Sequence, residues 1–429
     1  MTFSWTNPQI YNGDNNIFPL RDPFILKEGD VWYMTGTLPP YGLREEAART
    51  KGVPLYKSSD LKNWTFIDHI VKTPAEAEGK WYSERFWAPE IFLHNGIYYL
   101  TVNCCQVDGE NHGFLFAKAD HIEGPYTLMN PDAPFKLGND AHLFADDDGE
   151  VYLFASGIWM SKIDLENLRL LTDITYPVTP IPDSDAWNAL REKVGFEGPY
   201  VLKYDQKYYM FYSTWARGYE VGIAAADTPD GEWNMYPQPM YGAIDQNWCN
   251  EYGGIYEDNY YTAQDKYGQC GHNCAFEGPD GGIWIAAHAY DVGVDNFMDV
   301  KFVMDKLTFD DERGILAVDT LTGKTINGPT WGELSVECGT PDSAYNEKTS
   351  AVTPLYALNV HSYALQNSVY KLPAKADIRL SNSFRVCAPV TWHETVNLTV
   401  CGDQKICGTA VYQGIEYPVQ AVVTVVDAL

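Results

Sequence analysis

A strand–turn–strand pattern occurs five times in the first 290 residues, and it constrains the fold more than any other feature of the sequence. Each copy is an apolar run, a tight turn rich in Gly, Asp or Asn, and a second apolar run that ends in small or polar residues. The copies are RDPFILKEGDVWYMTGT (21–37), APEIFLHNGIYYLTVN (88–103), NDAHLFADDDGEVYLFAS (139–156), FEGPYVLKYDQKYYMFYS (196–213) and GHNCAFEGPDGGIWIAAHA (271–289). A motif that recurs at intervals of tens of residues indicates a repeat architecture.

A second pair of short apolar runs lies between the copies, for example at 55–67, 115–129 and 221–236. Four strands per unit and five units predict a five-bladed β-propeller. A many-stranded sandwich is the alternative, which the regular repeat disfavours. After residue 335 a polar, turn-rich linker precedes short strands that favour a small immunoglobulin-like β-sandwich. We therefore expect an all-β protein with a propeller domain at 1–335 and a sandwich domain at 346–429.

Charge and hydropathy exclude some classes of partner. The net charge of −28 repels nucleic acid and anionic membrane surfaces. No apolar run approaches the roughly 18 residues that span a bilayer. The N-terminus, MTFSWTNPQIYNG, has neither the basic start nor the apolar core of a signal peptide. We expect no nucleic-acid or membrane partner, and a cytoplasmic protein unless a signal has been removed.

Three glutamates precede Gly-Pro, at positions 123, 197 and 277, and the propeller topology separates them. The first strand of each blade lines the axis and begins at one face, called here the upper face. Glu197 begins such a strand, whereas Glu277 falls in a turn at the lower face and Glu123 in a peripheral turn at the same lower face. Only Glu197 can therefore enter an upper pocket on the axis. The acidic run 146–148 also falls in a lower turn, where we expect it to be solvated.

Each copy of the repeat begins with a polar residue on the axis, namely Asp22, Glu90, Asp140, Glu197 and His272. An acidic residue at the start of a strand often caps backbone amides, so none of them identifies a site alone. Asp22, Asp140 and Glu197 nevertheless converge on one pocket, and like charges this close are unfavourable unless they serve chemistry. The ends of the second strands share the upper face and carry Thr37, Asn103, Ser156, Trp215 and His288.

Together these motifs resemble glycoside hydrolase family 43, five-bladed propellers that act on arabinose- and xylose-containing glycans. The matching segments, within about residues 15–335, are RDPFI, WAPEI, NDAHLFADDDG, FEGPYV and GHNC. The resemblance implies an inverting glycosidase for α-L-arabinofuranosyl or β-D-xylosyl linkages of an oligosaccharide or polysaccharide. It implies Asp22 as general base, Glu197 as general acid, and Asp140 as the carboxylate that orients the acid and raises its pKa. His272 matches a histidine beside a central metal ion, so a structural Ca²⁺ on the axis is a candidate, with no cofactor required for the chemistry.

Such hydrolysis needs one carboxylic acid to protonate the leaving oxygen and one carboxylate to activate water on the opposite face. A third carboxylate beside Glu197 disfavours its ionisation and keeps it a proton donor. Arg21 is adjacent to Asp22, but strand alternation predicts that its side chain points elsewhere. Trp87 and Trp215 are candidates for stacking against sugar, and packing between blades is the alternative for both.

One position departs from the family pattern. Family members often carry an arginine on the last blade near the sugar pocket, where this chain has Lys301, and that difference bears on the sugar more than on the reaction. Two other functions stay open: a non-catalytic carbohydrate-binding propeller, which the three carboxylates disfavour, and a propeller glycosidase of other specificity, for example galactan- or fructan-directed. The WMNDPNG-like first blade of retaining fructosidases is absent, because blade 1 reads FPLRDPF. The C-terminal segment resembles bacterial immunoglobulin-like modules.

Overall fold

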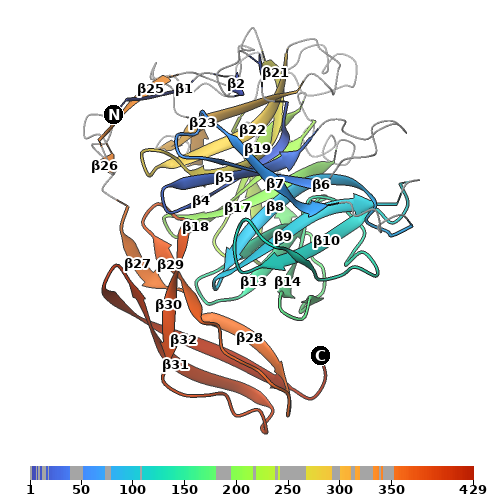
Figure 1. The fold of residues 1–429 in the computed structure, drawn as a ribbon, viewed down its shortest axis with the longest axis vertical. Helices are drawn as coiled ribbons and strands as arrows, with labels where there is room; N and C mark the ends of the chain where they lie inside the picture. Colours follow the sequence, from blue (N-terminus) through green and yellow to red (C-terminus); the bar gives the residue numbers. More distant parts are fainter. Residues whose placement is uncertain are drawn as a thin grey trace.

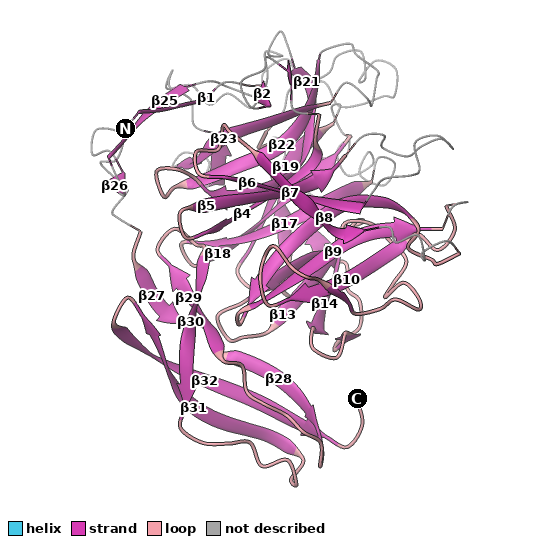
Figure 2. Ribbon diagram, in the orientation of Figure 1, coloured by secondary structure: helices cyan, strands magenta, loops and turns pink. Residues whose placement is uncertain are grey.

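The structure is a computed structural model, and it describes residues 2–5, 7, 10–11, 16–17, 19–38, 52–72, 79–106, 109–179, 195–215, 219–236, 240–241, 267–291, 300–310, 315–318, 332–337, 340–341 and 352–429. Within these ranges every regular element is a β-strand (Figure 2). None of the described residues forms a helix with the length and apolar character needed to cross a membrane.

Five sheets follow one another along the chain, each with four antiparallel strands in sequence order, and the sheet of blade 4 has a fifth strand at its outer edge (Figure 1). Blade 1 has β4 (Arg21–Glu28), β5 (Val31–Thr37), β6 (Gly52–Ser58) and β7 (Thr65–Lys72), and blade 2 has β8 (Glu84–His94), β9 (Ile97–Cys105), β10 (Gly113–Ala119) and β11 (Thr127–Leu128). Blade 3 has β12 (His142–Ala145), β13 (Val151–Ala155), β14 (Trp159–Asp164) and β15 (Arg169–Leu170), and blade 4 has β17 (Phe196–Tyr204), β18 (Lys207–Thr214), β19 (Glu220–Ala226) and β20 (Trp233–Met235). Blade 5 has β21 (Tyr267–Glu277), β22 (Ile283–Asp291), β23 (Lys301–Asp310) and β24 (Ile315–Val318). The five-bladed propeller is therefore confirmed.

Short strands join the ends of the propeller segment. β1 (Thr2–Trp5) pairs antiparallel with β25 (Gly332–Glu337), so the two ends of that segment lie side by side. β25 also pairs with β26 (Thr340–Pro341), and β2 (Ile10–Tyr11) forms a hairpin with β3 (Asn16–Ile17). β16 (Val178–Thr179) adds to blade 4 by parallel pairing with β20.

The second strands of the blades are covered on both faces by neighbouring blades. In β9 every residue from Tyr98 to Cys105 is buried, so its sequence is mostly apolar and does not alternate with exposed polar residues. Aromatic rings fill the spaces between blades; Phe154 of blade 3 meets Trp233 of blade 4 edge-on, with ring centroids 6.0 Å apart. Much of the high aromatic content therefore serves inter-blade packing.

The inner strands share an interruption at their upper ends. Register shifts occur in β4, β8, β17 and β21, and each of these strands has a shift that spans a residue with positive φ near the axis. These residues near the axis are Asp22 (49°), Ala88 (45°), Gly198 (54°) and His272 (49°), and Asp140 (60°) has the same place before β12. A bulge with one residue in the left-handed region bends the strand and redirects the side chains around it.

The sequence predicts that the five polar residues at the strand starts occupy equivalent positions, and the bulges show that two of them do not. Asp22, Asp140 and His272 are equivalent, but Glu90 lies two residues beyond the left-handed Ala88, and Glu197 lies one residue before Gly198. Glu90 accordingly lies deeper in the channel, where its Oε2 is 2.7 Å from His142 Nδ1. Glu90 is therefore a structural partner of His142, whereas Glu197 stays at the mouth of the channel.

The C-terminal residues 352–429 form a separate β unit below the propeller, with the strand order β27-β29-β30-β31-β32-β28 (Figure 1). The strands are β27 (Pro354–Ala357), β28 (Val360–Leu365), β29 (Lys375–Leu380), β30 (Arg385–Trp392), β31 (Gly402–Tyr412) and β32 (Ile415–Val426). The first part of β30 pairs with β29 and its end pairs with β31. The unit has a hydrophobic core of its own, which includes Ile378 and Val423. Its assignment to the immunoglobulin-like class stays a prediction.

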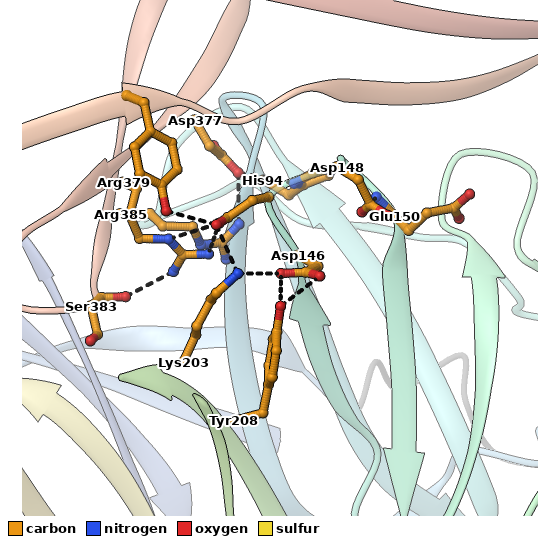
Figure 3. Close-up of polar contacts among 12 residues, drawn as sticks. His94, Asp146, Asp148, Glu150, Lys203, Tyr208, Asp377, Arg379, Ser383 and Arg385 are labelled. Carbon is orange, nitrogen blue, oxygen red and sulfur yellow. Dashed lines mark hydrogen bonds and ion pairs between the residues drawn. The ribbon is translucent and has the colours of Figure 1, made fainter. Parts of the chain in front are cut away.

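This C-terminal unit docks on the lower hairpin turns of the propeller (Figure 3). Asp147 accepts hydrogen bonds from Arg379 Nη2 at 2.7 Å, from Tyr356 Oη at 2.7 Å and from Lys203 Nζ at 2.8 Å. The expectation that the acidic run 146–148 is solvated is therefore wrong, because its central residue is a docking contact. The sequence of the turn gives no sign of the surface that covers it.

A second docking contact is centred on Asp377, which is 1% exposed. Its Oδ2 lies 3.0 Å from Nδ1 of the propeller residue His94 and accepts a hydrogen bond from Arg385 Nη1 at 2.7 Å (Figure 3). Between the two units lies a cavity of about 450 Å³, lined by the inner strands of all five blades and by residues of β29 and β30. The C-terminal unit therefore covers the lower end of the central channel.

Candidate active site

Asp22, Asp140 and Glu197 surround the same space at the upper ends of the inner strands. The backbone N–H of Gly198, directly after Glu197, donates to Asp140 Oδ2 at 3.1 Å. Nδ1 of His272 lies 3.3 Å from Asp22 Oδ1. Burial lowers the pKa of His272, but the charges of Asp22, Asp140 and Glu197 outweigh it and raise that pKa. The structure thus brings the three predicted carboxylates together around one histidine ring.

The carboxyl of Glu197 is held in its neutral form over a wide pH range. Burial and the nearby charge of Asp140 raise the pKa of Glu197 to about 7, against the opposing effects of His272, Tyr219 and Arg21. Its Oε1 accepts a hydrogen bond from Tyr219 Oη at 2.6 Å. A carboxyl with this pKa can donate a proton near neutral pH.

Asp140 is fixed by four hydrogen bonds. Asn103 makes two of them, since its Nδ2 donates to Asp140 Oδ1 at 3.0 Å and its Oδ1 accepts from the Asp140 amide at 3.0 Å. The hydroxyl of Ser156 donates to Oδ2 at 2.6 Å, and the Gly198 amide donates to the same oxygen. Donors are thus directed at both oxygens of the Asp140 side chain and fix its position. Asp140 therefore places a fixed negative charge beside Glu197.

Asp22 is held in the opposite protonation state. Burial raises its pKa, but the charges of His272 and Arg21 outweigh that effect and hold the pKa well below its usual range. Thr37 Oγ1 donates to Asp22 Oδ2 at 2.6 Å, and the Asp22 amide donates to His288 Nδ1 at 3.2 Å. Burial lowers the pKa of His288 to about 4, so its ring is neutral and Nδ1 can accept that bond.

Arg21 is close enough to Asp22 and Glu197 for its charge to act on both, so the prediction that it points elsewhere is wrong. Its charge lowers the pKa of both Asp22 and Glu197. Burial lowers the pKa of Arg21 itself, but the charges of Asp22, Tyr290 and Glu197 are among those that raise it above its usual value. Strand alternation fails here because Asp22 has a left-handed φ of 49°, so consecutive side chains no longer face opposite sides.

The sequence of residues 14–313 matches Glycosyl hydrolases family 43, and this segment is more than half of the chain. The chain belongs to glycosyl hydrolase family 43. It is a glycoside hydrolase, as the resemblance of its five motifs implies.

Individual relatives in family 43 act on related sugars. The extracellular exo-α-(1→5)-L-arabinofuranosidase of Cellvibrio japonicus is 24% identical over 308 residues, which cover 65% of this chain and 81% of that protein. A xylosidase/arabinosidase of Butyrivibrio fibrisolvens is 28% identical over 223 residues, or 48% of this chain and 39% of that protein. The crystal structure of a thermostable family-43 glycoside hydrolase superposes with a TM-score of 0.56 at 26% identity, covering 76% of this chain and 99% of the other.

In this family 43 chain, residues at the ends of the second strands make hydrogen bonds to the acidic residues, as expected from the position of these strand ends on the upper face. Thr37, Asn103 and His288 each contact Asp22 or Asp140. Tyr219, the partner of Glu197, was not among the predicted site residues. It precedes β19, a third strand, and the sequence carries no repeat signal that marks this position.

The two predicted sugar-stacking tryptophans have different surroundings. The ring centroid of Trp215 lies 4.6 Å from that of Tyr219. The ring of Trp87 meets His112 edge-on at 5.4 Å, and the Arg85 guanidinium lies 5.0 Å from its centroid. Both rings have protein neighbours, so sugar stacking by Trp87 or Trp215 stays a prediction.

His272 does not belong to a ready-made metal cage. Among the residues that the structure describes, no three His, Cys, Asp or Glu side chains are placed to hold an ion together. Ca²⁺ takes about six to eight oxygen ligands, so a ring nitrogen alone does not define a site for it. The expected Ca²⁺ stays a prediction, which metal analysis and melting with and without chelator would test. Lys301, on the last blade, is buried and pairs with Ala289 near the upper end of β22.

Proposed function

We propose that this family 43 enzyme hydrolyses α-L-arabinofuranosyl or β-D-xylosyl linkages of plant-type oligosaccharides or polysaccharides, with inversion at the anomeric carbon. The observation that carries the proposal is the opposite protonation of two carboxyls in one pocket. The pKa of Glu197 is raised to about 7, whereas that of Asp22 is held well below its usual range. At a pH between these two pKa values Glu197 carries a proton and Asp22 is ionised, so Glu197 can act as the acid and Asp22 as the base of the hydrolysis.

In the proposed reaction Glu197 gives its proton to the glycosidic oxygen as the bond from that oxygen to the anomeric carbon breaks. Asp22 takes a proton from a water molecule, whose oxygen bonds to the anomeric carbon from the opposite face. The alcohol leaves neutral, and the sugar is released as the opposite anomer. Proton exchange with solvent then returns Glu197 to the acid form and Asp22 to the carboxylate. Asp140 and Arg21 act on this cycle through their charges.

The sugar specificity is supported by the relatives rather than by a single contact. Their names include both arabinofuranosidase and xylosidase activities. Lys301 stands in place of the last-blade arginine, which gives no ground for choosing between the two sugars. We therefore propose both pentosides as substrates, to be separated by assay.

A panel of nitrophenyl glycosides tests the proposal, with proton NMR of the first-formed sugar on the active substrate. We expect hydrolysis of α-L-arabinofuranoside or β-D-xyloside and a product of inverted configuration, because the carboxyls of Asp22 and Glu197 should be about 6.5–9.5 Å apart. Retention of configuration would exclude Asp22 as a base. Binding of arabino- or xylo-oligosaccharides without release of reducing sugar would instead support a carbohydrate-binding propeller.

A further inference from the structure

A column of stacked rings connects the two sides of the pocket. The ring of Trp215 packs on Tyr219 at 4.6 Å, and Tyr219 stacks on His288 at 5.3 Å with 22° between the ring planes. Each of the two stacked residues also bonds to an acidic residue. Tyr219 Oη donates to Glu197 Oε1 at 2.6 Å, and His288 Nδ1 accepts from the Asp22 amide at 3.2 Å. The residues proposed as acid and base therefore rest on the same rigid column.

Tyr219 is fixed from several directions. Its side chain is 2% exposed, and its carbonyl accepts a hydrogen bond from the Cys270 amide at 2.7 Å. The ring lies so close to β21 that a Cβ at Gly271 would be 2.3 Å from Tyr219 Cε1. Because the ring is buried and packed against Gly271, Trp215 and His288, these contacts hold its hydroxyl in place beside Glu197.

We infer that Tyr219 is a positioning residue for the proton donor: it holds Glu197 with Oε1 as the carbonyl oxygen, so that the transferable proton sits on Oε2 and faces the leaving oxygen. A neutral carboxyl has one oxygen that accepts and one that carries the proton. Since the Tyr219 hydroxyl donates to Oε1, that oxygen is the acceptor. This inference rests on the proposed function, in which Glu197 is the general acid.

The hydrogen bond also acts on the acidity of Glu197. Among the described groups near this carboxyl, the charge of Asp140 raises its pKa, and His272, Tyr219 and Arg21 lower it. The charge of Glu197 also acts on Tyr290. Removal of the Tyr219 hydroxyl should therefore raise the pKa of Glu197 and free the carboxyl to rotate. A residue that only fills space would cause neither effect.

The test is Tyr219→Phe in the full chain, with two measurements besides overall rate. We expect the alkaline limb of kcat/KM to move to higher pH. We also expect about a tenfold loss on an arabino- or xylo-oligosaccharide but little loss on a dinitrophenyl glycoside, as part of the about 10²–10⁴-fold that general acid catalysis contributes. The matched control is Tyr208→Phe, since Tyr208 Oη also donates to a carboxylate, Asp146, at 2.7 Å, but at the lower face. The control should keep the wild-type alkaline limb and the wild-type ratio of activity on the oligosaccharide to activity on the dinitrophenyl glycoside.

A second variant serves if Tyr219→Phe does not fold. Difluorotyrosine at position 219 keeps the ring and makes the hydroxyl a stronger donor, so the alkaline limb should move to lower pH. A wild-type limb and leaving-group ratio in either folded variant would overturn the inference while leaving the proposed function intact. Failure of the unmodified enzyme to cleave any pentoside would overturn the proposed function instead.

Discussion

The amide of Gly198 donates to Asp140 Oδ2 at 3.1 Å, so the residue that follows the proposed acid is tied to the charge that controls it. Glu197 and Asp140 belong to different blades, and this bond fixes the backbone of one against the carboxylate of the other. The raised pKa of Glu197 is thus a property of the junction between blades 3 and 4. Each effect on this pKa can be tested separately.

Asp140→Asn removes the charge and keeps an oxygen that can accept from Gly198. Because the charge of Asp140 raises the pKa of Glu197, its loss should lower that pKa, and the alkaline limb of kcat/KM should move to lower pH. The pH–rate profile on an aryl pentoside measures the change. Asp164→Asn, at the other end of blade 3, should leave the limb in place; if it shifts the limb equally, the effect is not local.

Arg21→Met should have the opposite effect. The charge of Arg21 lowers the pKa of both Glu197 and Asp22, so its removal should raise both and move the whole pH–rate profile to higher pH. The same assay compares it with Arg169→Met, whose guanidinium lies 5.1 Å from the ring of Tyr363 in the C-terminal unit. An unchanged profile for Arg21→Met would show that the guanidinium does not act on the two carboxyls.

Leaving-group dependence separates the roles of the two main carboxylates. General acid assistance contributes about 10²–10⁴-fold when the leaving group is a poor one, such as a sugar alkoxide. Glu197→Ala should lose a factor of that order on oligosaccharides and much less on a dinitrophenyl glycoside, which leaves without a proton. Asp22→Ala should lose similar amounts on both, since water must be activated whatever leaves. The reverse pattern would exchange the two roles.

The docking contact at Asp147 should carry measurable stability. Asp147→Ala would leave Arg379, which is 5% exposed, with the Ser383 carbonyl as its one remaining hydrogen-bond partner among the described residues. Breaking one side of a buried ion pair costs about 3–5 kcal/mol, so we expect a loss near the lower end of that range in the free energy of unfolding. Glu123→Ala, which breaks an exposed pair with Lys57, is the control and should cost about 0–1 kcal/mol. Equal losses in denaturant unfolding would argue against a docking role.

Removal of residues 352–429 should lower the stability of the protein without changing its catalytic activity. Among the described residues, those that contact the three carboxylates lie in the propeller, so the shortened chain should stay folded and hydrolyse aryl pentosides with similar kcat/KM. Its melting temperature should fall, because His94 loses Asp377 and the floor of the cavity opens. A folded but inactive shortened chain would mean that the C-terminal unit contributes to the site.

The repeat in the sequence was sufficient to predict the blades and to select Glu197 among three similar glutamates. Both predictions depend on a local pattern that recurs in every blade, in which apolar runs are separated by turn residues. Arg21 was misplaced because alternation assumes a regular strand, and the left-handed φ of Asp22 is not visible in a single sequence. The acidic turn at Asp147 was misjudged because the sequence of one unit does not say which of its surfaces the other covers. Tyr219 contacts Glu197 from a position just before a third strand, 22 residues further along the chain, and no local sequence pattern marks that contact.

The left-handed residues at the upper ends of the inner strands limit how this enzyme can be improved by selection. Asp22, Asp140 and His272 have positive φ, a conformation that costs a residue with a side chain roughly 1–2 kcal/mol and costs glycine almost nothing. A search for heat resistance alone would therefore favour glycine at these three positions and select stable proteins that lack the proposed base, Asp22, and the carboxylate beside Glu197. Directed evolution of this scaffold needs turnover as a condition in every round.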